Sequence, residues 1–205
     1  MNKYQPIPLE KGNYYHIYNR GNNGNDIFFD SASYLHFLKL YNKYIVPIAE
    51  TYAWCLLKNH FHFLIYTKLN HEILYDELNY STIEKTSETD PSKQFGFLFN
   101  AYTQSVNKKF GRTGSIFEKL FERKLVNSES YLKNLIFYIN NNPIHHGITD
   151  KISNYKWSSY NSVVSHKPTK LNRTAILELF GGNQPFVEYH FSTKKLDNIA
   201  NLIIE

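Results

Sequence analysis

Three stretches of the chain have the apolar patterning of β-strands. The first covers residues 13–20 and ends at the glycines and asparagines of residues 21–24. The other two, residues 51–57 and 60–67, are separated by Lys58 and Asn59. Because two apolar runs around a very short polar connection are typical of a tight hairpin, we expect these two strands to pair.

Apolar residues recur at helical spacing in two of the intervening stretches. Residues 31–46 are expected to form a helix that Pro47 closes. Its apolar spacing falls on Leu35, Leu38 and Tyr41 or Asn42. A second helix is expected over residues 95–110, stopped by Gly111, and residues 117–126 are expected to be partly strand.

A third helix is expected over residues 128–141. Ser128 suits its N-cap, Glu129 lies in its first turn, and Pro143 is expected to stop it. An apolar stripe would dock on the sheet through Leu132, Leu135, Ile136 and Ile139. A neighbouring face carries polar groups, namely Tyr131, Asn134, Tyr138 and Asn142.

The resulting order is β-α-β-β-α-β followed by a helix. This order predicts an α+β protein of the ferredoxin-like, split βαβ kind, with a single antiparallel sheet flanked by helices. We expect one catalytic domain over residues 1–165, with an acidic insertion near residues 71–93. Residues 166–205 are expected to form a helical C-terminal appendage, with a helix near residues 173–180.

Composition narrows the class of protein. The 205 residues contain one cysteine, Cys55, which excludes an intramolecular disulfide framework and a cysteine-rich zinc module. No apolar run approaches the roughly 18 residues that a transmembrane helix needs, and the N-terminal sequence shows no apolar stretch of a signal peptide. We therefore expect a cytoplasmic protein without a membrane partner, with Cys55 packed in its core.

Charge and aromatic content favour a nucleic-acid partner. The net charge is +5 and aromatic residues make up 17% of the chain, which supplies cations for phosphates and ring faces for unstacked bases. A proteome rich in Lys, Asn and Tyr would produce the same composition. The charge is uneven, because residues 71–90 carry six acidic and one basic side chain, and residues 91–126 carry seven basic and two acidic ones. The second segment is the better candidate for a phosphate-facing surface.

The sequence His60-Phe61-His62 lies in the second strand of the expected hairpin. Side chains alternate along a strand, so both imidazoles point to one face and Phe61 points to the other. Two neutral imidazoles about 7 Å apart along the backbone suit a single metal ion. The alternative is a pair of polar residues on a solvent-facing strand. His16 is expected on the same sheet face, although not as a ligand.

Four motifs, in order over roughly residues 12–165, resemble one family. Residues 59–64 (NHFHFL) look like the His-hydrophobe-His signature of HUH single-strand endonucleases. Residues 138–147 (YINNNPIHHG) resemble the Tyr-x-x-x-Asn-Pro-x-x-x-Gly run of REP-associated tyrosine transposases. Residues 155–160 (YKWSSY) and 114–118 (GSIFE) are similar to that family's Tyr-x-Trp-Ser-Ser-Tyr and Gly-x-Leu-Phe-Gln segments.

The resemblance implies a covalent mechanism with a divalent metal ion. In this family a histidine pair holds Mg²⁺ or Mn²⁺, and a helical tyrosine attacks the scissile phosphate to give a 5′-phosphotyrosine and a free 3′-hydroxyl. Carried over, His60 and His62 are the metal ligands and Tyr138 is the nucleophile. Asn142, one helical turn after Tyr138, is the expected third ligand, with Asn141 as its substitute. Imidazole ligands favour Mn²⁺ over Mg²⁺.

The resemblance also implies the substrate and the reaction. We expect a single-stranded DNA transesterase, a transposase or endonuclease, that nicks hairpin-forming repeat DNA. One alternative is a non-catalytic nucleic-acid-binding module on the same fold. Another is a metal hydrolase of small phosphoesters, in which water is the nucleophile and the tyrosine is structural. The sequence leaves open whether the protein is a monomer or a homodimer.

The basic residues expected to contact DNA are Arg123, Lys124, Lys108, Lys109 and Arg112. The first two match basic positions in a strand of the family. The other three are expected to bind backbone phosphates, with a solvated helix face as the alternative. Two positions depart from the family, because Leu120 stands where many members have arginine and Lys58 replaces a common proline.

Overall fold

The computed structural model describes residues 7–77, 90–118 and 121–191. Its centre is a four-stranded antiparallel sheet with the strand order β2-β3-β1-β4. The strands are β1 (Tyr14–Arg20), β2 (Ala49–Leu56), β3 (His60–Thr67) and β4 (Glu122–Val126). The helices are α1 (Ser31–Tyr44), α2 (Pro91–Phe110), α3 (Glu129–His145), α4 (Tyr160–Val164), α5 (Arg173–Phe180) and α6 (Asn183–Phe191).

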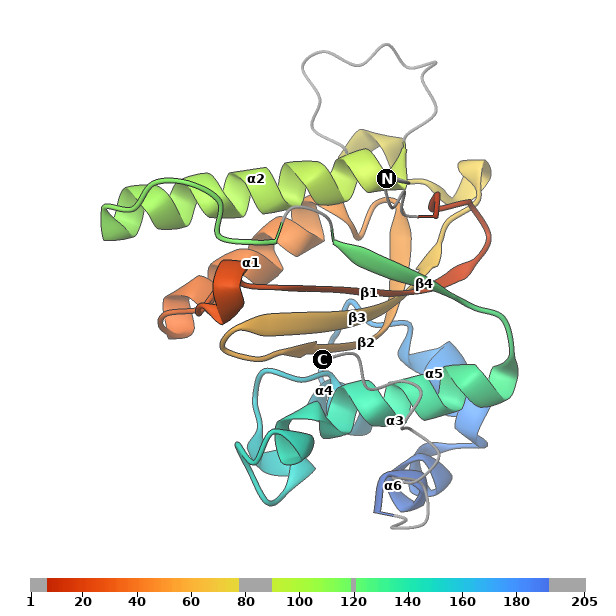
Figure 1. The fold of residues 1–205 in the computed structure, drawn as a ribbon. Helices are drawn as coiled ribbons and strands as arrows, with labels where there is room; N and C mark the ends of the chain where they lie inside the picture. Colours follow the sequence, from red (N-terminus) through yellow and green to blue (C-terminus); the bar gives the residue numbers. More distant parts are fainter. Residues whose placement is uncertain (1–6, 78–89, 119–120, 192–205) are drawn as a thin grey trace, which may run out of the picture.

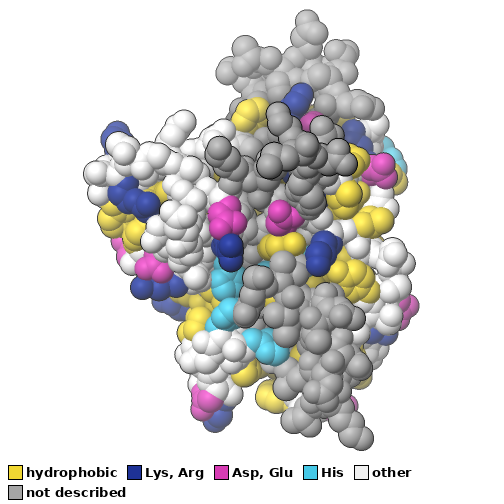
Figure 2. Space-filling model, in the orientation of Figure 1, with side chains coloured by type: hydrophobic (Ala, Val, Ile, Leu, Met, Phe, Trp, Pro, Cys, Tyr) yellow, Lys and Arg dark blue, Asp and Glu magenta, His cyan; other side chains and the backbone are white. Residues whose placement is uncertain are grey.

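The helices form two layers with the sheet between them. Figure 1 shows α1 and α2 on one face of the sheet and α3 to α6 on the other. In the same view, histidine side chains reach the surface between these two layers (Figure 2). The chain order β1-α1-β2-β3-α2-β4, combined with the observed strand order, is the split βαβ arrangement. The predicted α+β, ferredoxin-like fold is therefore confirmed.

The β2–β3 hairpin is closed by a turn that also binds the segment after β1. The Lys58 carbonyl accepts from the backbone N–H of Ile27 at 2.8 Å, and the Asn59 carbonyl accepts from Gly21 at 2.8 Å. Gly21 is required here, because a Cβ would lie 1.8 Å from the carbonyl oxygen of Asn25. The end of β1 and the start of β3 are therefore fixed to each other, immediately before His60.

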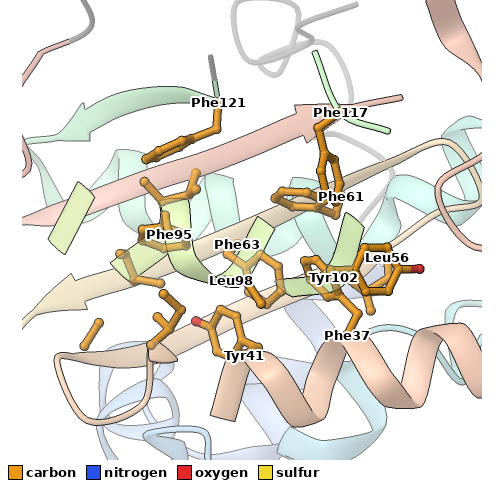
Figure 3. Packing of buried hydrophobic residues seen from close by; sticks show 14 of the residues in the cluster. Phe37, Tyr41, Leu56, Phe61, Phe63, Phe95, Leu98, Tyr102, Phe117 and Phe121 are labelled. Atoms are coloured by element: carbon orange, nitrogen blue, oxygen red, sulfur yellow. The ribbon is translucent and has the colours of Figure 1, made fainter. Parts of the chain in front are cut away.

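The core between the sheet and the α1/α2 layer is built from aromatic rings (Figure 3). Phe37 of α1 has ring neighbours on both sheet and α2, with centroids 5.4 Å from Phe61 and 5.1 Å from Tyr102. Tyr41 stacks on Phe63 at 4.3 Å with an angle of 10° between the ring planes. Offset-stacked and edge-to-face pairs of this kind stabilise the layer beyond the area that they bury.

The buried face of α1 differs from the predicted one. Leu35 is 60% exposed, whereas Tyr34, Phe37 and Tyr41 are buried. The two stripes are neighbours on the helix surface, and the one with aromatic rings removes more apolar area from water. The prediction was therefore wrong at Leu35, whereas Tyr41 is buried as expected, Leu38 packs against the core, and the helix itself is confirmed.

The helix α2 begins four residues before its predicted start. The Asp90 side chain accepts from the backbone N–H of Ser92, and Pro91 occupies the first turn, where a missing N–H costs nothing. Gly111 ends the helix in the left-handed conformation, with φ of 62°, as predicted. Part of the expected acidic insertion, residues 78–89 with Glu84 and Glu88, lies outside the described residues.

The helix α3 begins as predicted but does not stop at Pro143. Ser128 is the N-cap, with its hydroxyl accepting from the backbone N–H of Tyr131 at 3.2 Å. The helix continues to His145, and Pro143 is buried inside it. Proline removes only the hydrogen bond to the carbonyl of Ile139, and the packing of this last turn against the sheet holds it helical.

The predicted apolar stripe of α3 packs on the sheet. Its four leucines and isoleucines are buried together with Cys55 and Leu64 in the core of the α3 layer. Ile176 of α5 and Phe186 of α6 are fully buried in the same core. Residues 192–205 of the expected appendage and residues 119–120 lie outside the described residues. No helix in the described ranges is long and apolar enough to cross a membrane.

Candidate active site

The two histidines of β3 lie side by side on the sheet face that α3 covers. Their ring centroids are 5.3 Å apart. His60 pairs across the sheet with Arg20, and His62 pairs with Tyr18. His62 is only 2% exposed, so the alternative of two polar residues on a solvent-facing strand is wrong. Phe61 and Phe63 point into the aromatic core on the opposite face, as the strand alternation predicted.

The helix α3 brings two further side chains to the histidines. The Tyr138 ring lies 5.5 Å from the His62 ring, centroid to centroid. The amide oxygen of Asn142 lies 3.2 Å from Nε2 of His60. Residues four apart share one face of a helix, which is why both reach the same place. His60, His62 and Tyr138 line a cavity of about 400 Å³.

Three consecutive asparagines of α3 point in three directions. Asn140 accepts from the Ser159 hydroxyl at 2.6 Å and lies 3.2 Å from Nε2 of His190 on α6. Asn141 donates to the backbone carbonyl of Phe137, in its own helix. Of the three, Asn142 is therefore the one whose side chain faces the histidine pair, and Asn141 does not replace it.

The histidines are neutral at neutral pH. Burial lowers the pKa of His60 to about 4, and His146 and the charge of Arg20 lower it further, whereas the contact with Asn142 opposes this shift. Burial also lowers the pKa of His62 well below its ordinary value, and the neighbouring histidines His16, His60 and His146 lower it further. A neutral imidazole keeps one nitrogen lone pair, which is the form that binds a metal ion.

The surroundings of His60 fit a cation. Its Nδ1 lies 2.8 Å from the amide oxygen of Asn59, and its Nε2 lies 3.2 Å from that of Asn142. A neutral imidazole carries one N–H, so one of its two nitrogens presents a lone pair to an oxygen acceptor. If Nδ1 donates to Asn59, Nε2 and the Asn142 oxygen both present lone pairs, an arrangement that a cation would stabilise.

A metal ion at this place would have two imidazoles and one amide oxygen as donors. The described residues contain no group of three or more His, Cys, Asp or Glu side chains that could hold a metal ion. A third donor beside the two histidines would therefore have to be Asn142, whose amide oxygen lies 3.2 Å from Nε2 of His60.

His16 supports the second histidine. It is fully buried on β1, and its Nε2 lies 3.0 Å from Nδ1 of His62. This contact occupies Nδ1 of His62 and leaves Nε2 as the nitrogen available to a ligand in the cavity. Burial lowers the pKa of His16 to about 3, with a smaller effect of the Lys124 charge. The predicted placement of His16 on this face is confirmed.

Several residues of the cavity were assigned no role from the sequence. Arg20, Glu118 and Glu122 all line it. Arg20 follows from strand alternation, because it lies two and four residues beyond Tyr18 and His16 on β1, and so on the same face. The two glutamates arrive from the segment that precedes β4 and from β4 itself, so that only the tertiary structure places them here.

The charged groups of the cavity favour a cation. Glu118 and Glu122 contribute two negative charges and Arg20 one positive charge, and His60 and His62 are neutral. Figure 2 shows acidic and basic side chains next to the histidines on this face. A divalent cation would reverse the sign of the local charge, which would then attract a phosphate.

The predicted DNA contact of Arg123 needs correction. Its side chain is 8% exposed, donates to the Ser92 hydroxyl at 2.7 Å and lies over the Phe121 ring. Arg123 pairs with Ile17, so it points to the α2 side of the sheet. An arginine held in this way is part of the core. Lys124 pairs with His16 and therefore lies on the histidine face.

The three basic residues at the end of α2 lie in the other helical layer. Lys109 forms an ion pair with Asp30 at 2.6 Å. The guanidinium of Arg112 lies over the Phe29 ring at 5.3 Å, and Lys108 is exposed. None of the three lines the cavity, so their predicted contact with DNA stays a prediction for a surface outside it.

Comparison with known proteins identifies the fold. No protein-family model and no curated protein matches the chain. A solved structure of a REP-associated tyrosine transposase bound to a REP hairpin is similar, with a TM-score of 0.57 and 16% identity over 82% of this chain and 89% of that one. The fold that the sequence resemblance implied is therefore shown.

Two further solved structures have a more distant likeness. Both are of a bacterial tRNA(His) guanylyltransferase (Thg1)-like protein, in complex with GTP and with ATP. Each is 12% identical, with TM-scores of 0.41 and 0.40. The matches cover 69% and 68% of this chain, and 69% and 63% of those chains. At these scores neither bears on the fold.

Proposed function

We propose that this chain is a metal-dependent single-stranded DNA transesterase, which nicks hairpin-forming DNA through a covalent tyrosine intermediate. The observation that carries the proposal is that His60, His62 and Tyr138 line one cavity, while the buried Asn142 contacts His60 from the same helix as Tyr138. A chain with the same fold is described as bound to a REP hairpin. The net charge of +5 also suits a nucleic-acid partner.

The metal ligands in this proposal are His60, His62 and Asn142. They would hold Mg²⁺ or Mn²⁺, which supplies a Lewis acid that polarises a phosphate oxygen. The neutral imidazoles and the amide oxygen supply the lone pairs. Asn59 and His16 hold the two rings in place through the ring nitrogens that face away from the ion.

The nucleophile in this proposal is Tyr138. Its hydroxyl oxygen bonds to the phosphorus of a DNA phosphodiester and loses its proton, and the bond from phosphorus to the 3′-oxygen breaks. The 3′-oxygen takes up a proton and leaves as a free hydroxyl. The DNA fragment on the 3′ side of the nick stays on Tyr138 through its 5′-phosphate as a phosphotyrosine, which conserves the energy of the phosphodiester for a second transfer.

A covalent adduct tests the proposal. The protein is incubated with Mn²⁺ and a labelled hairpin oligodeoxynucleotide with single-stranded flanks, from inverted repeats next to its gene, and is run on a denaturing protein gel. We expect a labelled protein band that is lost in Tyr138→Phe and in His60→Ala. Tyr131→Phe is the matched control, because Tyr131 lies on the same helix but outside the cavity.

Two outcomes would contradict the proposal and identify an alternative. Tight binding of the hairpin with no adduct at any metal concentration would favour the non-catalytic binding module. Cleaved DNA that still forms with Tyr138→Phe would show that water is the nucleophile, as in a metal hydrolase.

A further inference from the structure

We infer that Arg20 binds a DNA backbone phosphate at the mouth of the cavity, and that Glu118 is the positioning residue that orients it. The inference rests on the proposed function, because it assigns the phosphate-binding group of the same site. Arg20 lies outside the four motifs that resemble the family. Glu118 is the last position of one of them, residues 114–118, but that motif gave neither the metal ligands nor the nucleophile.

The position of Arg20 is set by the sheet. It is the last residue of β1 and pairs directly with His60 on β3. Paired residues on neighbouring strands have side chains on the same face, so the guanidinium stands beside the histidine pair. Arg20 and Glu118 both line the cavity. A phosphate that reaches His60 therefore passes within reach of Arg20.

The ion pair leaves the phosphate-binding part of Arg20 available. Its Nε donates to a carboxylate oxygen of Glu118 at 2.7 Å. The two terminal nitrogens have no hydrogen-bond partner among the described residues. These two nitrogens form the fork that binds phosphate oxygens in pairs. A carboxylate at Nε fixes the direction of the fork without occupying it.

Glu118 is itself held in place by the backbone. Its N–H donates to the Arg20 carbonyl at 3.0 Å, and its carbonyl accepts from the Asn19 side chain at 3.4 Å. A bridge between Gly21 and Phe117 continues this pairing on the next residues. The carboxylate therefore starts from a fixed point next to Arg20, as a positioning residue requires.

The ion pair itself contributes little to stability. The side chains of Arg20 and Glu118 are 59% and 38% exposed, and exposed pairs of this kind are weak and screened by salt. Substitutions at either residue are therefore expected to leave the protein folded. They test binding of DNA rather than folding.

DNA affinity in a non-cleaving background tests the inference. Variants are made in Tyr138→Phe, and binding of the labelled hairpin oligodeoxynucleotide is measured by fluorescence anisotropy at several salt concentrations, with Mn²⁺ present. We expect Arg20→Gln to weaken binding by about tenfold or more, as for a lost charged hydrogen bond. The slope of log affinity against log salt should fall by about one. Arg20→Lys keeps the positive charge and therefore the salt dependence, but it loses the fork of two nitrogens. Its affinity for the hairpin should lie between that of the parent and that of Arg20→Gln.

Substitutions of Glu118 separate orientation from charge. Glu118→Gln keeps an oxygen that accepts from Nε and removes a negative charge, so we expect DNA binding equal to or tighter than that of the parent. Glu118→Ala removes the acceptor, and we expect weaker binding in spite of the same change in charge. Equal affinities of Glu118→Gln and Glu118→Ala would overturn the positioning role.

A distant lysine supplies the control for charge. Lys133 pairs with Glu129 at the start of α3, away from the cavity. If Lys133→Gln and Arg20→Gln weaken binding equally, Arg20 has no specific role, and the inference fails while the proposed function stands. If the parent protein neither binds the hairpin nor forms an adduct, the proposed function fails and the inference fails with it. An unchanged thermal unfolding midpoint for each variant shows that a change in DNA affinity is not caused by loss of folded protein.

Discussion

The two faces of the sheet are buried in different ways. The face under α1 and α2 is filled by aromatic rings, with Phe37, Phe61 and Phe63 completely buried. The face under α3 also has an apolar core, but it contains a concentration of buried polar side chains, namely His16, His62, Asn140, Asn141, Asn142, Ser158, Ser159 and His190. His62 and Phe63 are consecutive residues of β3, and their side chains point to opposite faces of the sheet.

This difference separates the parts of the molecule that stabilise the fold from those that form the site. Close packing of rings on the α1/α2 face supplies free energy of folding. On the α3 face, each buried polar group must find a hydrogen bond or a ligand, because an unpaired one costs free energy. We therefore expect substitutions on the first face to change stability and substitutions at the cavity to change chemistry.

The largest expected effect is the loss of activity in His60→Leu. Loss of a metal ligand removes several kcal/mol of transition-state stabilisation, so adduct formation should fall to about one-thousandth or less. The free energy of unfolding should fall by at most about 1–3 kcal/mol, the cost of the side-chain contacts that Asn59 and Asn142 lose. Gel assays and urea unfolding measure the two quantities. A loss of stability as large as that expected for a buried aromatic ring would break the proposed separation of the two faces.

The matching change on the other face is Phe63→Ala. Phe63 is fully buried and stacks on Tyr41, so the cavity left behind should cost about 3–5 kcal/mol of unfolding free energy. Adduct formation per folded molecule should stay near that of the wild type. Urea unfolding followed by circular dichroism gives the first value, and the gel assay below the unfolding transition gives the second. A strong loss of adduct in fully folded protein would contradict the comparison.

A smaller effect, on metal binding, is expected at His16. This residue lies on the α3 face of the sheet and contacts His62, but it does not line the cavity. His16→Phe removes the hydrogen-bond partner of Nδ1 of His62, and losing such a partner typically weakens metal binding about tenfold to a hundredfold. His16→Gln can place its amide oxygen near the former Nε2 and should recover most of the affinity. Isothermal titration with Mn²⁺ measures both. Equal affinities of the two variants would show that His16 only fills space.

The smallest effect concerns charge at the rim of the α1/α2 face. Ion pairing with Lys109 and the backbone N–H of Ser33 hold the pKa of Asp30 below its ordinary value of 3.8. A lowered pKa in the folded state means that the charge stabilises the protein above about pH 4, and that this contribution is lost as the pH falls further. Asp30→Asn keeps an N-cap and removes the charge.

Unfolding midpoints measured between pH 7 and pH 2 test this expectation. The wild type should be slightly more stable than Asp30→Asn at pH 7, and the difference should shrink as the pH falls through the pKa of Asp30. A difference that grows toward low pH would have the wrong sign and would contradict the assignment.

The order of elements could be predicted from the sequence because its signals are local. The hairpin around Lys58 and Asn59, the glycine stop at Gly111 and the Ser128 cap depend on residues close together in the chain. His60, His62 and Asn142 could also be brought together from alternation, helical spacing and the family resemblance. In each case the structure has the predicted neighbours.

The errors arose where tertiary packing decides. The stripe of α1 with Leu35 and the stripe with Phe37 are both helical, and only the sheet selects the second. Pro143 looked like a stop because a sequence shows its missing N–H but not the buried last turn of α3. Arg123 looked like a DNA contact, whereas the register of β4 turns it inward.

The residues whose role was missed converge from distant segments. Arg20, Glu118 and Glu122 belong to β1, to the segment before β4 and to β4 itself, which lie far apart in the sequence. Their approach depends on the antiparallel pairing of β1 with both of its neighbours. A sequence-based search of motifs finds the reacting groups of such a site more easily than the charged groups around them.

The asparagine run of α3 has a consequence for how this protein diverges. Successive residues of a helix are turned by about 100°, so Asn140, Asn141 and Asn142 point in three directions and have different partners. Each position is therefore constrained separately. Position 142 is constrained by the amide oxygen that faces His60, and position 140 by the attachment of α6. Position 141 donates only to its own helix. Among descendants of this gene, we expect position 141 to vary first, although the three letters read as a single motif.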